Sequence, residues 1–354
     1  EDTVYLSSKA GMAELMKNGC TTTSDHHYVF PLNRGDLIGA QIAAADALGM
    51  RTNFTRGSMD LSKKDGGLPP DTVVQTVDGI LKDSTALVEK YHDRSFQAMH
   101  RIALAPCSPF SVSDTLLRES AILARELGVR LHTHLAETKD EEDYTLGKYG
   151  MRPLEYMQSL GWVGSDVWYA HGIHFNSEEL KVLAETGTGV AHCPTSNMNL
   201  SSGVARVPEM LELGIPVGLG VDGAASNNGT NLLEEIRVGY LLHRLNSADN
   251  DVTAYQMLKL ATIGGARVLG REKEIGSIEV GKCADILLMN VNRLDLVGAY
   301  YDPKSILSTV GLKGYMDCTI INGKVTVREG ELVSIDEKQL IADANKEVVR
   351  FLQD

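Results

Sequence analysis

Short apolar segments alternate with helical segments along most of this chain, and that alternation limits the folds open to it. Seven segments have the pattern of buried strands, near residues 20–25, 51–56, 101–106, 130–135, 166–171, 188–192 and 216–221. Helical patterns lie between them, including one over 71–91, and another over 252–268 follows the last strand. Strands joined through helices pair in parallel with right-handed crossovers, so a β/α barrel or an open doubly wound sheet is expected. We favour an α/β fold of the (β/α)8 barrel type that lacks its first strand in this chain, with that strand preceding residue 1.

From about residue 274 the sequence pattern changes to that of a small β module. Asn322-Gly323 stands between β-branched runs, which is a strong hairpin signal. The chain then closes with an amphipathic helical pattern. We therefore predict a barrel over residues 1–273, a small appended β module over 274–336 and a C-terminal helix within 337–354.

Charge and composition exclude several classes of function. The net charge of −13 disfavours nucleic acid as a partner, since phosphate binding depends on Lys and Arg. No apolar run is long enough for a membrane span, and the first residues lack a signal-peptide pattern. Five scattered cysteines without CxxC spacing suit reduced thiols, so a cytoplasmic location is expected. We also expect a homo-oligomer that binds a small molecule, with neither nucleic acid nor membrane as a partner.

Polar residues follow three of the predicted strands at their carboxyl ends. His134 ends one strand with Glu137 three residues later, His171 ends the next, and Asp222 follows a strand that contains Gly218 and Gly220. The carboxyl ends of barrel strands form one mouth, where active sites lie. His134 and Glu137 reach one site only if the strand ends near His134 and the chain turns. Otherwise they are a buried imidazole and a surface carboxylate at a helix start.

Three further residues are weaker candidates for substrate contact. His192 ends a strand and could contact the substrate, support the site from behind, or cap the following loop. In the pair His26-His27 the two rings point to opposite sides of an extended chain, so at most one faces the site, and His27 is our pocket-lining candidate. Cys107 is assigned to substrate contact, because no base dedicated to activating its thiol is visible. The strand before Cys107 has no Lys to bridge two metals, so one metal ion is the simpler expectation.

Several motifs together resemble a known family. They are His-Leu-Ala-Glu-Thr at 134–138, Ala-His-Gly at 170–172, His-Cys-Pro-Thr-Ser-Asn at 192–197 and Val-Asp-Gly-Ala-Ala-Ser-Asn-Asn at 221–228. They are similar to the amidohydrolase superfamily, in particular its branch of aminohydrolases and chlorohydrolases acting on nitrogen heterocycles. Within that branch, Thr-Thr-Ser-Asp-His-His-Tyr at 22–28, Arg-Gly-Ser-Met-Asp-Leu-Ser at 56–62 and Ala-Pro-Cys-Ser-Pro-Phe-Ser at 105–111 look most like 8-oxoguanine deaminases.

The resemblance implies a role for each main candidate. His134 and Asp222 would bind one divalent metal ion, with Zn²⁺ the best match and Fe²⁺ the alternative. Glu137 would be the acid–base group, and His171 would hold the attacking water or assist the metal. Asp222 would also act in catalysis, and Cys107 falls where relatives contact the substrate. The family takes two further ligands from a His-x-His motif on its first strand, which we expect upstream of residue 1.

The resemblance also implies a reaction and its rivals. The expected activity is metal-dependent hydrolytic deamination of a purine-like ring, with 8-oxoguanine giving urate and ammonia. Isoxanthopterin, guanine or an amino- or chlorotriazine are alternative substrates of the same machinery. A barrel that binds a ligand without catalysis is a rival of a different class. A doubly wound dehydrogenase is the weaker rival at the level of the fold, because no GxGxxG follows an early strand.

Overall fold

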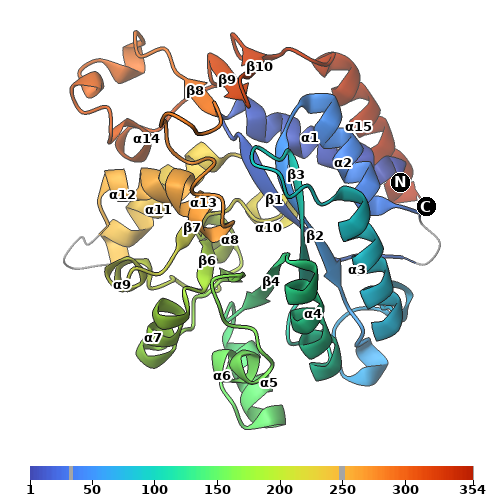
Figure 1. Ribbon diagram of the computed structural model, residues 1–354. Helices are drawn as coiled ribbons and strands as arrows, with labels where there is room; N and C mark the ends of the chain where they lie inside the picture. Colours follow the sequence, from blue (N-terminus) through green and yellow to red (C-terminus); the bar gives the residue numbers. More distant parts are fainter. Residues whose placement is uncertain (32–34, 247–251, 354) are drawn as a thin grey trace.

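A curled sheet of seven parallel strands organises the chain, as seen in a computed structural model (Figure 1). The model describes residues 1–31, 35–246 and 252–353. The strands are β1 (Thr22–His27), β2 (Arg51–Ser58), β3 (His100–Pro106), β4 (Arg130–Leu135), β5 (Val167–His171), β6 (Gly189–His192) and β7 (Val217–Leu219). They pair in the order β1 to β7, with no reversal of strand order. This is barrel-type topology and not a doubly wound sheet, so the predicted fold class is confirmed.

Helices precede, connect and follow the strands and flank the sheet (Figure 1). They are α1 (Asp2–Lys17), α2 (Leu37–Leu48), α3 (Val77–Tyr91), α4 (Asp114–Leu127), α5 (Lys139–Tyr149), α6 (Pro153–Ser159), α7 (Ser177–Thr186), α8 (Pro194–Asn199), α9 (Val207–Glu212), α10 (Ala224–Asn227), α11 (Leu232–Asn246), α12 (Ala254–Lys259) and α13 (Gly265–Val268). Local signals fix many of their ends: Ser113 caps α4 through its side chain, and Gly128 ends that helix in the left-handed conformation. Asn176 and Gly187 do the same for α7.

The two faces of the sheet differ in character near the centre. In-register pairs place His132 beside Trp168 and His134 beside Ala170 on one face. Leu135, the residue after His134, is fully buried on the opposite face. Strands buried on both faces tolerate polar groups only where those groups find partners. The imidazoles therefore gather on one face of the sheet, and that is the face on which the site is built.

Two predicted helices differ from the structure. The helix expected over 71–91 begins at Val77, after a short 3-10 turn at Asp71–Val73. The helix expected over 252–268 is divided by a π-helical turn, η3 (Leu260–Gly264), between α12 and α13. A Cβ atom on Gly264 would lie 2.2 Å from the carbonyl oxygen of Val217, so the turn brings helix backbone directly against β7. Helices α5 and α8 were not predicted.

A separate antiparallel sheet follows, as expected for the β module. Its strands are β8 (Ile286–Leu288), β9 (Cys318–Ile321), β10 (Lys324–Arg328) and β11 (Glu331–Leu332), in the order β11-β10-β9-β8. Asn322 and Gly323 have φ of +49° and +79°, which is the hairpin that their sequence predicts. The short helix α14 (Ile306–Thr309) precedes β9. A buried ion pair, Arg51 Nη1 to Asp285 Oδ2 at 2.5 Å, joins this module to β2.

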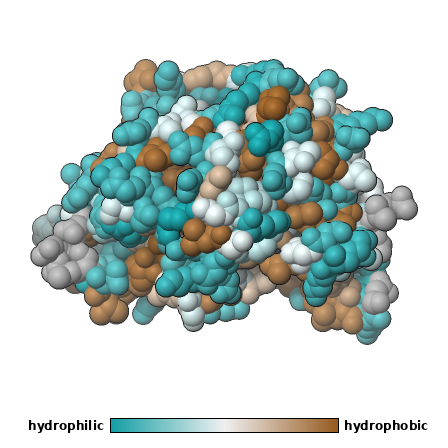
Figure 2. Space-filling model, turned by 90° about the horizontal axis from the view of Figure 1, so that it is seen from below, coloured by the Kyte–Doolittle hydropathy of each residue, from teal (hydrophilic) through white to brown (hydrophobic). Residues whose placement is uncertain are grey.

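The last helix, α15 (Glu337–Gln353), lies beside α1 (Figure 1). Lys17 Nζ contacts Glu337 Oε1 at 2.6 Å between the two helices. The division of the chain at residues 273 and 336 stays a prediction. No helix among the described residues has both the length and the apolar character that crossing a bilayer requires. On the face seen in Figure 2, hydrophobic residues are scattered among hydrophilic ones.

Candidate active site

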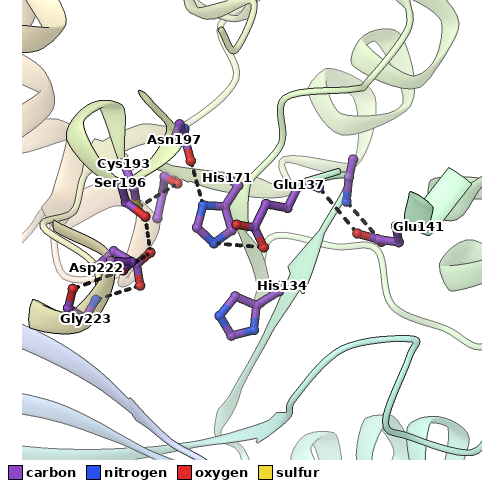
Figure 3. Close-up of polar contacts among 12 residues, drawn as sticks. His134, Glu137, Glu141, His171, Cys193, Ser196, Asn197, Asp222 and Gly223 are labelled. Atoms are coloured by element: carbon purple, nitrogen blue, oxygen red, sulfur yellow. Dashed lines mark hydrogen bonds and ion pairs between the residues drawn. The ribbon is translucent and has the colours of Figure 1, made fainter. Parts of the chain in front are cut away.

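Four predicted residues meet at the carboxyl ends of strands β4, β5 and β7 (Figure 3). His134 comes from the end of β4, Glu137 follows that strand, His171 ends β5 and Asp222 follows β7. The rings of His134 and His171 are stacked, with centroids 5.4 Å apart. Glu137 Oε2 lies 3.6 Å from His171 Nε2. The structure therefore brings the two imidazoles and two carboxylates to one place.

A backbone carbonyl fixes the orientation of His134. Its Nδ1 lies 2.7 Å from the carbonyl oxygen of Cys107, on the neighbouring strand end. Because a carbonyl only accepts, Nδ1 carries the proton and Nε2 of the neutral ring keeps a lone pair. Burial and the nearby His171 lower the pKa of His134, which favours the neutral ring. A metal-binding imidazole is held in this way, with its second nitrogen donating to a fixed acceptor.

The chain turns after β4 and so returns Glu137 to the side of His134. Strand β4 ends at Leu135, and Ala136 has φ of +54°, a left-handed value that is uncommon for a residue with a side chain. Glu141 holds this turn, because its carboxylate accepts the backbone N–H groups of Ala136 at 3.0 Å and Glu137 at 3.3 Å. Burial raises the pKa of Glu137 above its usual value, so this carboxyl group is suited to carrying a proton.

His171 enters the site through a similar departure from regular strand geometry. It is in register with Leu135, whose side chain lies on the other face of the sheet. A φ of +71° at His171 redirects the ring toward Glu137. Its Nδ1 lies 2.9 Å from Asn197 Oδ1. Burial lowers the pKa of His171. The ring is fully buried. Its Nδ1 contacts Asn197, and its Nε2 faces Glu137 at the centre of the site.

Asp222 is held as a carboxylate by several donors. Its φ is +61°, the third left-handed value at this site. Ser196 Oγ donates to Oδ2 at 2.6 Å, Ser226 Oγ donates to the same oxygen at 3.0 Å, and the Gly223 N–H donates to Oδ1 at 2.7 Å. Burial acts to raise the pKa of Asp222, but the hydrogen bond from Ser196, the electrostatic interaction with the His171 ring and the Gly223 N–H together lower it. Asp222 is therefore an anion at neutral pH.

His134 and Asp222 fit a metal ion as two members of a ligand set. One offers the free Nε2 of an oriented neutral imidazole, and the other offers an ionised carboxylate. Over residues 1–31, 35–246 and 252–353, no group of three or more His, Cys, Asp or Glu side chains is arranged to hold a metal ion. The assignment of His134 and Asp222 as metal ligands stays a prediction.

The thiol of Cys107 is not an activated nucleophile in this structure. Burial raises its pKa to about 11, so it is protonated at neutral pH. The carbonyl of Cys107 has the clearer role, since it accepts hydrogen bonds from the ring and the backbone N–H of His134. Substrate contact by this side chain stays a prediction.

Two other predicted residues have ring contacts with residues outside the central four, and their contact with substrate stays a prediction. His192 is fully buried and its Nε2 lies 3.1 Å from Nε2 of His243 on helix α11. His27 packs its ring edge-on against Phe30, with centroids 5.0 Å apart. Its neighbour His26 is the ring on the site's face, stacked on His134 at 4.7 Å. Strand alternation indicated that one of the pair would face the site, and the structure places His26 there.

Sequence reasoning also missed the residues that hold the central four in place. Ser196 and Asn197 lie inside a motif that we noted, but no helical pattern marked the short helix α8 that presents them. Glu141 lies in α5, a helix with weak amphipathic character that was likewise not predicted. The acidic first turn of α5 was the available signal, since carboxylates are favoured near helix N-termini.

A family model described as "Amidohydrolase family" matches residues 1–326. An 8-oxoguanine deaminase from Pseudomonas aeruginosa is 46% identical over 337 residues, which cover 95% of this chain and 74% of that protein. A hydroxydechloroatrazine ethylaminohydrolase from Pseudomonas sp. (strain ADP) is 41% identical, covering 98% of this chain and 72% of that protein.

Solved structures agree with the sequence matches. A crystal structure of atrazine chlorohydrolase from Arthrobacter aurescens, complexed with zinc, superposes with a TM-score of 0.94 at 33% sequence identity. The match covers 98% of this chain and 77% of that one. The superposed region includes the main sheet and the small antiparallel sheet. The 33% sequence identity indicates membership of a common family as well as a common fold.

Proposed function

Because this chain belongs to the amidohydrolase family, we propose that it catalyses hydrolytic deamination of an amino-substituted purine-like ring, with 8-oxoguanine as the substrate. It is a hydrolase of the branch that acts on C–N bonds in cyclic compounds. One observation carries the proposal: His134, Glu137, His171 and Asp222 meet at one mouth of the sheet in a chain 46% identical to an 8-oxoguanine deaminase. The products would be urate and ammonia.

We propose one divalent metal ion for this site, with Zn²⁺ preferred and Fe²⁺ as the alternative. His134 Nε2 and the Asp222 carboxylate would hold it, together with two further imidazoles that we propose upstream of residue 1. A zinc-complexed relative supports this choice. A bound ion of this kind lowers the pKa of a water ligand to about 7 and so supplies hydroxide at neutral pH.

The residues of this chain divide the proton transfers between two carboxyl groups. Asp222, whose pKa is lowered, accepts the proton of the attacking water. Glu137, whose pKa is raised, gives a proton to the ring nitrogen next to the amino-bearing carbon. The water oxygen bonds to the amino-bearing carbon. Glu137 then passes the proton of the new hydroxyl group to the amino group, so the C–N bond breaks, ammonia leaves and a C=O group remains. The proton held by Asp222 finally returns to Glu137. His171 holds the water between these groups.

Ammonia release from a panel of substrates tests the proposal. The panel is 8-oxoguanine, isoxanthopterin, guanine and a hydroxylated aminotriazine, and 8-oxoguanine should have the highest kcat/KM. A Glu137→Gln variant should lose about 10²–10⁴-fold in kcat, because it cannot carry the proton. Faster turnover of another member of the panel would overturn the choice of substrate. Full activity of Glu137→Gln would overturn the mechanism.

A barrel that binds a ligand without catalysis is a rival of a different class. Metal analysis of the purified full-length protein, with the proposed upstream ligands included, after zinc is supplied separates the two functions. Stoichiometric zinc that depends on His134 supports the hydrolase, whereas a folded chain that retains no zinc supports the binding module. Assembly into a homo-oligomer stays a prediction, to be measured by light scattering.

A further inference from the structure

Helix α8 presents two consecutive side chains to two different members of the site. Ser196 and Asn197 are both fully buried. Consecutive helical residues point about 100° apart. Ser196 Oγ reaches Asp222 Oδ2 at 2.6 Å, and Asn197 Oδ1 reaches His171 Nδ1 at 2.9 Å (Figure 3). One short helix behind the site therefore contacts both the carboxylate and the imidazole.

Hydrogen bonds fix this helix from both ends. The Asn197 N–H donates to the carbonyl of Cys193 at 3.0 Å, and the Ser202 N–H donates to the carbonyl of Asn197 at 2.9 Å. Glu235, buried on helix α11, accepts the Thr195 N–H at 3.1 Å. The amide of Asn197 thus projects from a backbone that is held on each side, so it can impose an orientation on the ring that it contacts.

The contact with Asn197 decides where the proton of His171 lies. The amide oxygen only accepts hydrogen bonds, so it pairs with a protonated Nδ1. The neutral ring then has an unprotonated Nε2, which is the nitrogen that lies 3.6 Å from Glu137 Oε2. A nitrogen with a lone pair at this position accepts a hydrogen bond from water. A protonated one would instead donate.

We propose that Asn197 is a positioning residue that keeps the proton of His171 on Nδ1, so that Nε2 presents its lone pair to the reacting water. The consequence for rate rests on the proposed function, but the tautomer itself does not. Ser196 belongs to the same helix and acts on Asp222, so it is a matched control for the effect on His171.

The test is nitrogen NMR of the metal-free 354-residue chain labelled with ¹⁵N-histidine, with the His171 signals assigned from a His171→Asn variant. Wild-type protein should show Nδ1 protonated and Nε2 unprotonated. Asn197→Asp keeps an acceptor and should keep the proton on Nδ1. Asn197→Leu removes the acceptor and should give a mixture of tautomers. Ser196→Ala should leave the His171 spectrum unchanged.

Kinetics of the zinc-loaded enzyme provide the second readout. Asn197→Leu should lower kcat by about 10–100-fold with a smaller change in KM, as for other groups that orient a ligand from behind. Met198→Leu, on the exposed side of α8, should leave kcat unchanged. A wild-type ring protonated only on Nε2, or an Asn197→Leu spectrum identical to wild type, overturns the proposal. If the tautomer behaves as stated but no substrate of the panel is turned over, the proposed function fails and the positioning role stands.

Discussion

The carboxylate of Glu141 accepts the backbone N–H of Glu137 at 3.3 Å and that of Ala136 at 3.0 Å. Glu141 is 2% exposed and lies in the first turn of α5. Helix α5, which follows β4, therefore also holds the turn that carries Glu137. Burial raises the pKa of Glu141 to about 8. Over the pH range between its ordinary pKa of 4.5 and this raised value, this carboxyl group therefore binds a proton in the folded protein but not in the unfolded chain.

The first prediction concerns the pH dependence of stability. The pKa of Glu141 is about 8 in the folded protein and has an ordinary value of 4.5 otherwise. Between these values the native state binds the extra proton, so the stability that Glu141 contributes falls as pH rises, by up to about 1.4 kcal/mol per pH unit. Glu141→Gln does not titrate and should lack this slope. Urea unfolding of both proteins between about pH 5 and pH 8 measures it, and parallel curves would contradict the prediction.

A second prediction separates the thiol of Cys107 from its carbonyl. Cys107→Ser keeps the backbone oxygen that orients His134 and removes only the sulfur. Since burial raises the pKa of this thiol to about 11, no thiolate is available at neutral pH. We expect kcat to change by less than about tenfold, with any larger change in KM. A loss of several orders of magnitude would be the signature of a covalent thiol mechanism.

A third prediction compares a buried ion pair with an exposed one. Asp285→Ala leaves the fully buried guanidinium of Arg51 without its carboxylate and should cost about 3–5 kcal/mol of unfolding free energy. Asp71→Ala breaks the pair between Lys64 and Asp71, whose side chains are both more than half exposed, and should leave the unfolding free energy nearly unchanged. Denaturant titration measures both. Equal losses would mean that the contact between β2 and the small sheet adds little to stability.

A fourth prediction uses two glycines with opposite surroundings. A Cβ on Gly264 would meet the Val217 carbonyl oxygen at 2.2 Å, so Gly264→Ala forces the π-helical turn away from β7 and should cost at least about 1–3 kcal/mol. Gly147 lies in α5 with nothing within 4 Å of its added Cβ. Gly147→Ala should stabilise by about 0.5–1 kcal/mol, because glycine disfavours a helix. Thermal unfolding of the two variants should therefore shift in opposite directions.

The parts of the fold that follow from local pattern could be predicted from the sequence. Strand β4 spans the expected residues 130–135, and the Asn322-Gly323 hairpin forms where its turn chemistry places it. The four central site residues were found because the carboxyl ends of parallel strands share one edge. These features depend on periodicity and on single residues, both of which are visible in a sequence.

The parts that depend on register or on tertiary contact could not be predicted. Which ring of His26-His27 faces the site depends on how β1 is aligned with β2. His192 meets His243, a contact between residues far apart in the chain. Helix α8 is six residues long and begins with Pro194, so it has too few turns to show a period. Its two polar side chains gain their roles only from packing against the strand ends.

The strands of the main sheet are arranged in chain order, so the groups of the site arrive on three strand-and-helix units: His134 and Glu137 on one, His171 on another and Asp222 on a third. Loops at the ends of strands tolerate changes while the scaffold stays fixed. A change in one peripheral segment can therefore reshape the pocket without moving the acid and imidazole groups that the other units carry.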